Sequence, residues 1–584
     1  MDENKKIEET PISLADAPTK KKISFFAAII LVIGNSVGAG IFFKSSEVMA
    51  NSGLSLVVAI VAWLVAGFAV ICMSLALVEV SSGRNDNLGV IGWCKAFNGK
   101  YVYKACKYFM VFIYLPLTYF FMPLYVLMSF QDALGYFGVS NNFGTSDDWA
   151  IWSVISLLMS LWFIFAAGLS SRIGNIQNKF ITALKFLPLI FAAIMGWIIA
   201  GSKGFGVQAD VHEHWSNPAA AKYNFFGISP LFGFFGSLAA IFFAYDGFYA
   251  TAGVQTEMRE PKKTPKALVI GLSIVTLIYT LIAVSMSVVG TDANLNSNQF
   301  KDFLKEKNVS WIGGIVNLLV AVGVMGILNG FSMWCARYIQ DLINEGELPI
   351  PAKWFKKCDN ANFPIIGVGF TVALTVPIVI IFDIIGGLGY FPGEHGYDAS
   401  EYNSTSKLYN FANLLATWCA VYAFAFIAWA IYGCIRNRKT NHVKVEKNKY
   451  FVPTAWVSVV LVFTAMFMSV VQPFVNIGLT ASVGGEQLTG NILLVVVLFL
   501  FAGISFVPVY FEERFVTARL AKLETWLEKY SKKLETITQS TGINTQEKTM
   551  CEEYIESLRG YIKATKIGIE SFKIDLRKPY CCVN

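Results

Sequence analysis

Two apolar stretches decide the fold of this chain: IGNSVGAGIFF at residues 33–43 and IFFAYDGFYATAG at residues 241–253. Each lies in a run long enough to cross a membrane, yet each holds residues that disfavour a continuous helix, since glycine costs about 1 kcal/mol relative to alanine. Non-helical backbone inside a bilayer is tolerated only in protein or beside a cavity, and in transporters such helix ends bind solute. The pair predicts a carrier with a central solute site. The helix-breaking residues are Gly34, Gly38, Gly40, Asp246 and Gly247.

The composition of the whole chain is that of a membrane protein. Of its 584 residues, 55% are hydrophobic and 15% charged, and the mean hydropathy is +0.52. These values exclude an ordinary soluble globule. Apolar runs of about 20 residues predict an all-α polytopic membrane protein with 12 transmembrane helices. The predicted spans begin near Phe25, Leu54, Tyr108, Ile151, Phe180, Pro230, Ala267, Trp311, Pro364, Leu408, Pro453 and Asn491.

The spans and their polar flanks divide the chain into five parts. A polar arm precedes the first span, two groups of five helices follow, and the last two helices lead into a polar, helical tail. We place these parts at residues 1–24 (cytoplasmic arm), 25–200 (helices 1 to 5), 201–435 (helices 6 to 10), 436–511 (helices 11 and 12) and 512–584 (cytoplasmic tail).

Lysine and arginine are distributed unevenly among the predicted loops. Most of them fall on the side of the N-terminal arm, and only a few, Lys44 among them, are assigned to the opposite side. Because cytoplasmic loops are enriched in these residues, both termini are predicted to be cytoplasmic and the protein to lie in the plasma membrane, in contact with the lipid bilayer. The net charge of +7 is then a signal of topology, and no nucleic acid partner is expected.

Ionisable side chains at bilayer depth are costly and are functional by default. Away from helix ends, only Lys185 and Asp246 meet this description in the sequence. Lys185 either extends its ammonium group to the inner surface or faces the bundle, where an amine can exchange a proton. Asp246 has three open roles: it can cap the second half-helix, bind a substrate amine or carry a proton.

Six motifs, in order and spacing, resemble the amino acid, polyamine and organocation (APC) transporter superfamily. Its L-type and cationic amino acid permeases are the branches that the chain resembles most. Together the motifs cover roughly residues 25–435. They are GAGIF at 38–42, LALVEVSSG at 75–83, NIQNKFITALKFLPL at 175–189, FAYDGF at 243–248, TEMREPKKTPKAL at 256–268 and NGFSMWCARYIQDLINEGELP at 329–349.

The resemblance implies a LeuT-like fold: a 5+5 inverted repeat in which helices 1 and 6 are broken and face each other, with helices 11 and 12 appended. In similar transporters the substrate carboxylate meets backbone N–H groups at the start of the second half of helix 1, where a helix N-terminus is partly positive. The substrate amine meets carbonyls that end the first half-helices. The matching residues are Val37, Gly38, Ala39 and Gly40 for the carboxylate and Ser36, Phe243 and Ala244 for the amine, with Asp246 and Gly247 beside them.

Two further positions carry expectations from the family. Phe243 resembles an aromatic gate over the solute; the alternative is an ordinary core residue among 48 phenylalanines. Lys185 matches a lysine that reaches toward helix 1 and replaces a sodium ion, which implies proton-linked or sodium-independent transport.

The chain departs from the family pattern in three places, one of which is Ala39 where the family commonly has a serine. It reads Ile343, Asn344, Glu345 and Gly346 where the family has Ala-Arg-Asp-Gly, so the inner gate is expected to pair differently. The outside loop at 131–150 lacks the cysteine through which animal L-type carriers bind a glycoprotein. No covalent heavy-chain subunit is therefore expected.

The tail carries an apolar stripe at the three- and four-residue spacing of packed helices. A break near Gly542 and a second amphipathic run predict a helical hairpin that lies under the transporter or makes a homo-oligomer contact; a solvated extension on the basic inner face is the alternative. The stripe consists of Leu520, Leu523, Leu527, Tyr530, Leu534 and Ile537, and the second run of Tyr554, Leu558, Ile562 and Ile569.

These features favour a secondary active transporter that moves amino acids across the plasma membrane by alternating access, with a proton as coupling ion. An amino acid exchanger shares the scaffold, and a sensor that signals through the tail without transporting is a second class. An enzyme, a cofactor and a metal site are not expected, since no triad, metal cluster or phosphate loop is visible. If Asp246 faces the solute, a cationic amino acid is favoured as the substrate. If Asp246 caps a helix, a neutral amino acid is as good a candidate as a cationic one.

Overall fold

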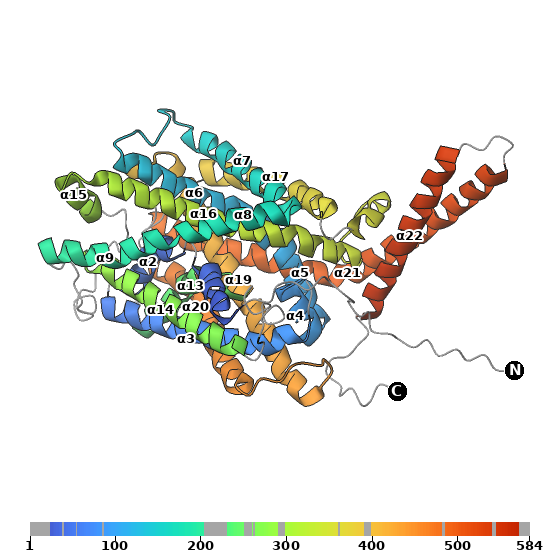
Figure 1. Cartoon of the computed structure of the whole chain (residues 1–584), viewed down its shortest axis with the longest axis horizontal. Coiled ribbons are helices and arrows are strands. Elements are labelled where there is room, and N and C mark those ends of the chain that lie inside the picture. Colours follow the sequence, from blue (N-terminus) through green and yellow to red (C-terminus); the bar gives the residue numbers. More distant parts are fainter. Residues whose placement is uncertain are drawn as a thin grey trace.

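The computed structural model of the protein describes residues 24–37, 40–53, 55–84, 87–203, 230–249, 260, 263–289, 298–359, 363–389, 399–481, 485–539 and 545–571. Within these residues all regular structure is helical, and the long helices run side by side as one bundle (Figure 1).

Ten of the described helical segments are long and apolar enough to cross a membrane. Two shorter apolar helices, Phe25–Gly34 and Leu231–Ala244, accompany them. The chain is thus a multi-pass membrane protein. The ten segments are Leu56–Ser82, Lys100–Tyr136, Asp148–Leu169, Ser171–Ser202, Thr264–Ser287, Ser310–Asn344, Ile365–Leu388, Thr405–Thr440, Phe451–Thr480 and Leu488–Gln539.

Regular elements carry the following labels and bounds. In the first half they are α1 (Phe25–Ser36), α2 (Gly40–Asn51), α3 (Leu56–Ser82), α4 (Val90–Phe97), α5 (Lys100–Phe109), η1 (Met110–Tyr114), α6 (Leu115–Tyr136), α7 (Asp148–Leu169), α8 (Ser171–Leu184) and α9 (Phe186–Lys203). In the second half they are α13 (Pro230–Ala244), α14 (Thr264–Ser287), α15 (Asn298–Glu306), α16 (Ser310–Asn344), η4 (Ala352–Asp359), α17 (Ile365–Leu388), α18 (Ala399–Tyr402), α19 (Thr405–Thr440), α20 (Phe451–Thr480), α21 (Gly485–Gln539) and α22 (Thr545–Ser571).

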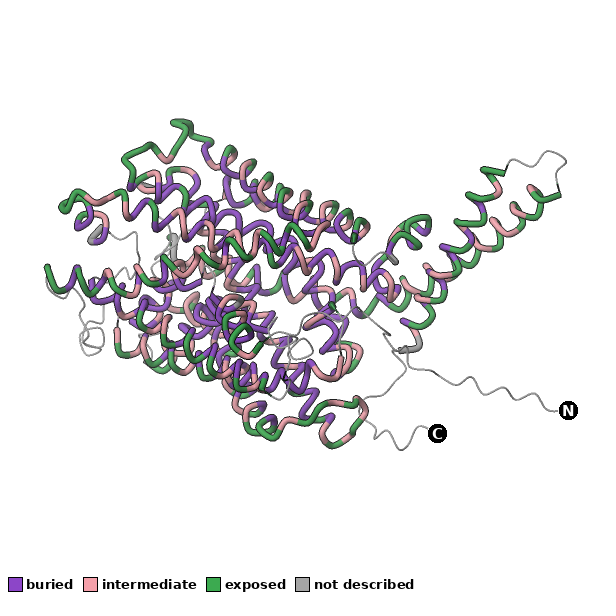
Figure 2. The backbone as a smooth tube through the Cα atoms, in the orientation of Figure 1, coloured by how far each residue is buried: buried purple, intermediate pink, exposed green. Residues whose placement is uncertain are grey.

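Two of the spanning segments form the centre of the bundle. In the most apolar window of Lys100–Tyr136, 94% of the residues are buried, and in that of Thr405–Thr440, 72%, whereas the other eight windows are at most half buried. The outer helices expose large apolar side chains such as Phe68, Trp162 and Phe467, and Figure 2 shows these exposed faces around a buried interior. Apolar groups on the outside suit contact with lipid rather than water.

The C-terminal tail is a pair of long helices that projects from one end of the bundle (Figure 1). α21 runs from Gly485 to Gln539 without interruption, so the boundary placed at residue 511 falls inside one helix. Residues 540–544, where the break near Gly542 was predicted, lie outside the described residues. α22 then packs along α21, with the rings of Tyr530 and Tyr554 4.5 Å apart. We call α22 and the distal half of α21 the hairpin, and the end of the bundle that bears it the hairpin end.

Candidate functional site

The first interrupted helix consists of α1 and α2. Val37 has an extended backbone, with φ −79° and ψ 112°, so the chain leaves the helix after Ser36. α2 begins at Gly40, and both Val37 and Gly40 are buried. Gly38 and Ala39, two of the four residues expected to bind the carboxylate, lie outside the described residues.

The second predicted interruption lies at the end of α13. This helix ends at Ala244, residues 245–247 form a turn, and residues 248–249 form a short 3-10 turn. The N–H of Asp246 donates to the Phe243 carbonyl at 3.1 Å, and Gly247 has φ +94°, a left-handed conformation that glycine adopts without a steric penalty. The chain thus leaves the helix at the Asp-Gly pair.

The start of α2 and the end of α13 touch each other. Gly40 packs so closely on Ala244 that a Cβ on Gly40 would overlap the Cα of Ala244. Tyr279 on α14 lies against the same chain ends, with its hydroxyl 2.9 Å from the carbonyl oxygen of Ser36 and 3.1 Å from that of Ala244. One hydroxyl has one hydrogen to donate, so these adjacent carbonyls keep unused acceptor capacity.

Lys185 lies at the junction of α8 and α9 and points into the bundle. Its ammonium group donates to the carbonyl oxygen of Gly34, and to that of Val37 at 3.2 Å. The side chain does not extend to the surface, because two carbonyls freed by the end of α1 hold its positive charge. Lys185 therefore sits at the first interruption.

Asp246 is held by a tyrosine and by its own turn. One carboxylate oxygen accepts from the Tyr114 hydroxyl at 2.7 Å and the other from the Gly247 N–H at 2.9 Å. The Tyr249 hydroxyl lies 3.2 Å from that of Tyr114. Tyr114 is the last residue of η1, a π-helical turn of the kind that often marks functional positions.

Phe243 packs in an aromatic group on the α2 side of α13. Its ring centroid lies 6.1 Å from that of Tyr125 and 6.3 Å from that of Phe121, both on α6. Tyr125 also stacks on Phe43 of α2 at 4.7 Å. Phe243 is thus a buried aromatic residue in contact with the helices that surround the interruptions, which fits either of its two expected roles.

Lys44 corrects an expectation from the loop charges, which placed it outside the membrane. It lies on α2 with no exposed surface, and its ammonium group is 2.7 Å from oxygens of three side chains and 5.2 Å from the centroid of the Phe243 ring. The charge count missed it because helix 1 resumes after its interruption and carries Lys44 one turn beyond Gly40, on the same face. The ammonium group donates to side-chain oxygens of Glu47, Asn413 and Thr417.

Asp383 is a second ionisable residue that the sequence reading missed. It lies near the end of α17, is 5% exposed and is adjacent to Ser153 of α7. One of its carboxylate oxygens has no hydrogen-bond partner among the described residues. Lys44 and Asp383 are thus two further ionisable residues buried in the bundle besides Lys185 and Asp246.

At the hairpin end, the residues after α16 form ion pairs with other helices. Glu345 accepts from Arg84 at 2.5 Å and from Lys95 at 2.8 Å. Arg337 instead donates to Ser171 at 2.6 Å. These groups lie away from the two interruptions and join helices rather than line a solute site.

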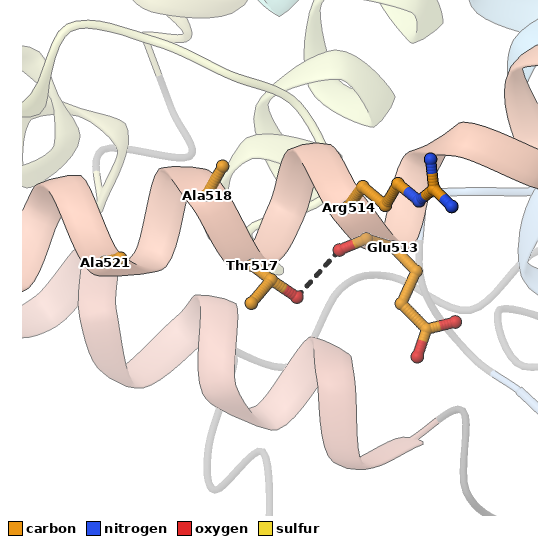
Figure 3. A pocket seen from close by; sticks show the side chains of 5 residues that line it. All are labelled: Glu513, Arg514, Thr517, Ala518 and Ala521. Carbon is orange, nitrogen blue, oxygen red and sulfur yellow. Dashed lines mark hydrogen bonds between the residues drawn. The ribbon is translucent and has the colours of Figure 1, made fainter.

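A shallow open groove lies on α21, next to the membrane part of the chain (Figure 3). All five of its lining residues belong to that one helix, and the Thr517 hydroxyl bonds to the Glu513 carbonyl one turn before it. A site for a small molecule needs groups that converge from several elements. The candidate site is therefore the junction of α1, α2 and α13.

The bundle of membrane-length helices, in which the start of α2 touches the end of α13 and free backbone groups lie at their contact, defines a multi-pass membrane protein. The chain belongs to the amino acid permease family, whose family model matches residues 23–501. The membership predicted from the six motifs is thereby confirmed, and the family is one of transporters rather than enzymes.

Individual relatives differ in how much of the chain they cover. An uncharacterized protein of Mycoplasma pneumoniae is 43% identical over 87% of this chain and 97% of its own. The serine/threonine exchanger SteT of Bacillus subtilis is 26% identical over 63% of this chain and 78% of its own. The large neutral amino acids transporter small subunit 2 of Homo sapiens is 25% identical over 64% and 66%. A solved structure of MhsT with L-phenylalanine covers 77% of this chain at 14% identity, with a TM-score of 0.46, too distant a likeness to add to the fold described above.

Proposed function

We propose that this protein is a secondary active transporter that moves amino acids across the plasma membrane by alternating access. The observation that carries the proposal is the contact between Gly40 and Ala244, which brings the ends of two interrupted helices together. An amino acid has a carboxylate and an ammonium group on one carbon, and this junction offers N–H donors and carbonyl acceptors side by side.

The proposed binding mode uses the backbone at both interruptions. The carboxylate lies at the start of α2, where the first N–H groups of a helix have no partner within it; Val37 and Gly40 flank this point. The substrate ammonium group donates to the carbonyl oxygens of Ser36 and Ala244, and it either displaces the Tyr279 hydroxyl from them or binds beside it. Gly38, Ala39 and Phe243 keep their proposed roles as carboxylate donors and aromatic gate.

The substrate class that we favour is the neutral amino acids. Asp246 already accepts bonds from Tyr114 and Gly247 on both carboxylate oxygens, which supports a role in shaping the turn rather than in binding a cationic side chain. Two relatives are named for neutral amino acids: one is a serine/threonine exchanger, and the other is a large neutral amino acids transporter subunit.

Proton coupling rests on Lys185. Its ammonium group places a positive charge against two carbonyls at the end of α1. This charge disfavours a metal cation at the same carbonyls. Loss of a proton from the amine would remove the charge and release the carbonyls. Exchange is the second candidate mode of the same transport, since one relative is named an exchanger.

We further infer a topology of 12 spans in a LeuT-like 5+5 inverted repeat, with α1 plus α2 and α13 plus the residues after it as the two broken helices. The hairpin end is assigned to the cytoplasm by the basic residues near it, and both termini keep the cytoplasmic side predicted from the loop charges. The apolar stripe of the tail packs against α22, with Leu523 and Leu558 buried, which supports a hairpin more than a contact between copies.

Uptake into proteoliposomes tests the proposal. Purified protein would be given a full amino acid mixture, with and without an inward proton gradient, and the internal pool read by mass spectrometry. Enrichment that depends on the gradient supports proton-coupled uptake, and uptake only into vesicles preloaded with amino acid supports exchange. If neither occurs while amino acids still bind, the protein is a sensor and the proposed transport is wrong.

A further inference from the structure

Residues 345–350, which follow α16, are held by two separate sets of contacts. We call them the α16 loop. One set joins the loop to residues near the end of α3, and the other joins it to the hairpin. The loop is therefore one of the places, with η4, where the C-terminal tail meets the bundle.

The first set of contacts crosses between two groups of helices. α3 packs chiefly on α13, α14 and α20, and α14 packs on α1, whereas α16 packs on α6, α7, α8 and α17. Glu345 connects the two groups, because it pairs with Arg84 just after α3 and with Lys95 on α4. Asn87 and Asp341 add a hydrogen bond of 2.9 Å across the same junction.

The second set comes from both helices of the hairpin. Arg519 of α21 donates to the Gly346 carbonyl at 2.5 Å. The Tyr561 hydroxyl of α22 accepts from the Ile350 N–H at 3.2 Å and donates to the Leu348 carbonyl at 3.3 Å. Gly346 has φ +71° and lies against the α22 backbone, where a Cβ would collide with Thr565. The hairpin thus holds the loop by its main chain at three successive places.

A buried ionic cluster lies beneath this contact. Glu347 of the loop is 2.6 Å from Lys104 and 3.0 Å from Lys107, and Glu512 of α21 pairs with the same two lysines. Burial alone would raise the pKa of Glu347, but the ammonium groups of Lys107, Lys104 and Lys95 outweigh it and hold this pKa well below its usual range. A buried pair that loses one partner leaves an uncompensated charge, so the loop and α21 are fixed to α5 together.

We propose that Arg519 and Tyr561 are positioning residues for transport: they hold the α16 loop so that Glu345 can pair with Arg84 and Lys95 and keep the hairpin end closed. The closed state is the one in which Ser36, at the end of α1, has no exposed surface. The role rests on the proposed transport. It gives the tail a function, namely setting how readily the hairpin end opens.

The test measures how fast a cysteine at Ser36 reacts from the hairpin side. Ser36→Cys would be placed in the full chain, in membrane vesicles that expose the hairpin, and treated with a membrane-impermeant maleimide. Mass spectrometry of the labelled peptide separates this cysteine from the native ones. Tyr561→Phe removes only the hydroxyl and keeps the ring on Phe355, and Arg519→Gln probes the same loop from α21. Tyr530→Phe, in the distal hairpin, is the matched control.

Tyr561→Phe, Arg519→Gln and Glu345→Gln should each speed labelling by about fivefold or more, since about fivefold corresponds to one ordinary hydrogen bond and each variant loses at least one. Tyr530→Phe should not change the rate. Because the hairpin acts through Glu345, adding Tyr561→Phe to Glu345→Gln should give little further increase. Wild-type rates in both hairpin variants, or effects that multiply in the double variant, would overturn the role. The labelling rate is measured without substrate. If the wild-type protein transports no amino acid, the proposed transport is wrong, but the labelling rates still show whether Arg519 and Tyr561 hold the α16 loop.

Discussion

Gly40 and Ala244 are in direct backbone contact, although 204 positions separate them in the sequence. Each stands at the end of a helix: Gly40 opens α2 and Ala244 closes α13. The absence of a side chain at Gly40 allows the approach, because any Cβ there would overlap main-chain atoms that cannot move aside.

Gly40→Ala is expected to reduce uptake at low substrate concentration by about tenfold or more, since overpacking a close contact costs about 1–3 kcal/mol. Uptake and the fraction of folded protein in the membrane would both be measured. Gly330→Ala is the matched control, because a Cβ at Gly330 meets nothing within 4 Å. Full uptake by Gly40→Ala would contradict the proposed carboxylate site.

Asp246→Asn should leave uptake of neutral amino acids largely intact, because the asparagine oxygen can still accept from the Gly247 N–H. KM for a neutral and for a cationic amino acid would be compared between this variant and wild type. Loss of a cationic substrate alone would instead assign Asp246 to the substrate side chain.

Tyr114→Phe should destabilise the protein by about 1–3 kcal/mol, since it takes a hydrogen-bond donor from a half-buried carboxylate. The midpoint of thermal unfolding in detergent measures this effect. Tyr450→Phe, at a half-exposed position, should leave the midpoint unchanged; equal midpoints for the two variants would mean that the Tyr114 bond contributes nothing.

Lys185→Ala is expected to remove the response of uptake to a proton gradient while amino acid binding persists. The substitution removes the ammonium group that holds the carbonyls of Gly34 and Val37, together with the methylene chain that carries it. Uptake with and without the gradient would be compared with that of Lys179→Ala, an exposed lysine of the same helix. A gradient response like that of wild type would refute the coupling role.

The folded protein is expected to lose stability in acid because of Glu347. Burial opposes its ionisation, but Lys107, Lys104 and Lys95 depress its pKa in the folded protein below the ordinary 4.5. A carboxyl whose folded pKa is depressed contributes stability fully above its unfolded value, and the contribution falls as pH drops below that value. Thermal unfolding measured from pH 7 down to about pH 3 should show this decline, and Glu347→Gln should be less stable at pH 7 and lose less on acidification. Parallel curves would argue against the ionic cluster.

Much of the fold could be predicted from the sequence because its signals are local. Runs of apolar residues set the membrane-length helices, and glycine near residue 40 and the Asp-Gly pair at 246 and 247 mark where two of them stop. Motifs of fixed spacing led to the amino acid permease family, which residues 23–501 match. Each of these signals depends on neighbours within a turn or two of the chain, so no tertiary contact is needed to read them.

The tertiary structure alone decided which side chains meet. Lys44 reads as a loop charge until α2 packs it against Asn413, and the partner of Asp246 is a tyrosine 132 positions away on η1. Glu345 pairs with Arg84, and the tail contacts the α16 loop, only because helices distant in sequence pack together. The stability of a buried ionisable group depends on the partner that the neighbouring helices provide. Which helix faces meet is set by tertiary packing, and local sequence patterns do not give it.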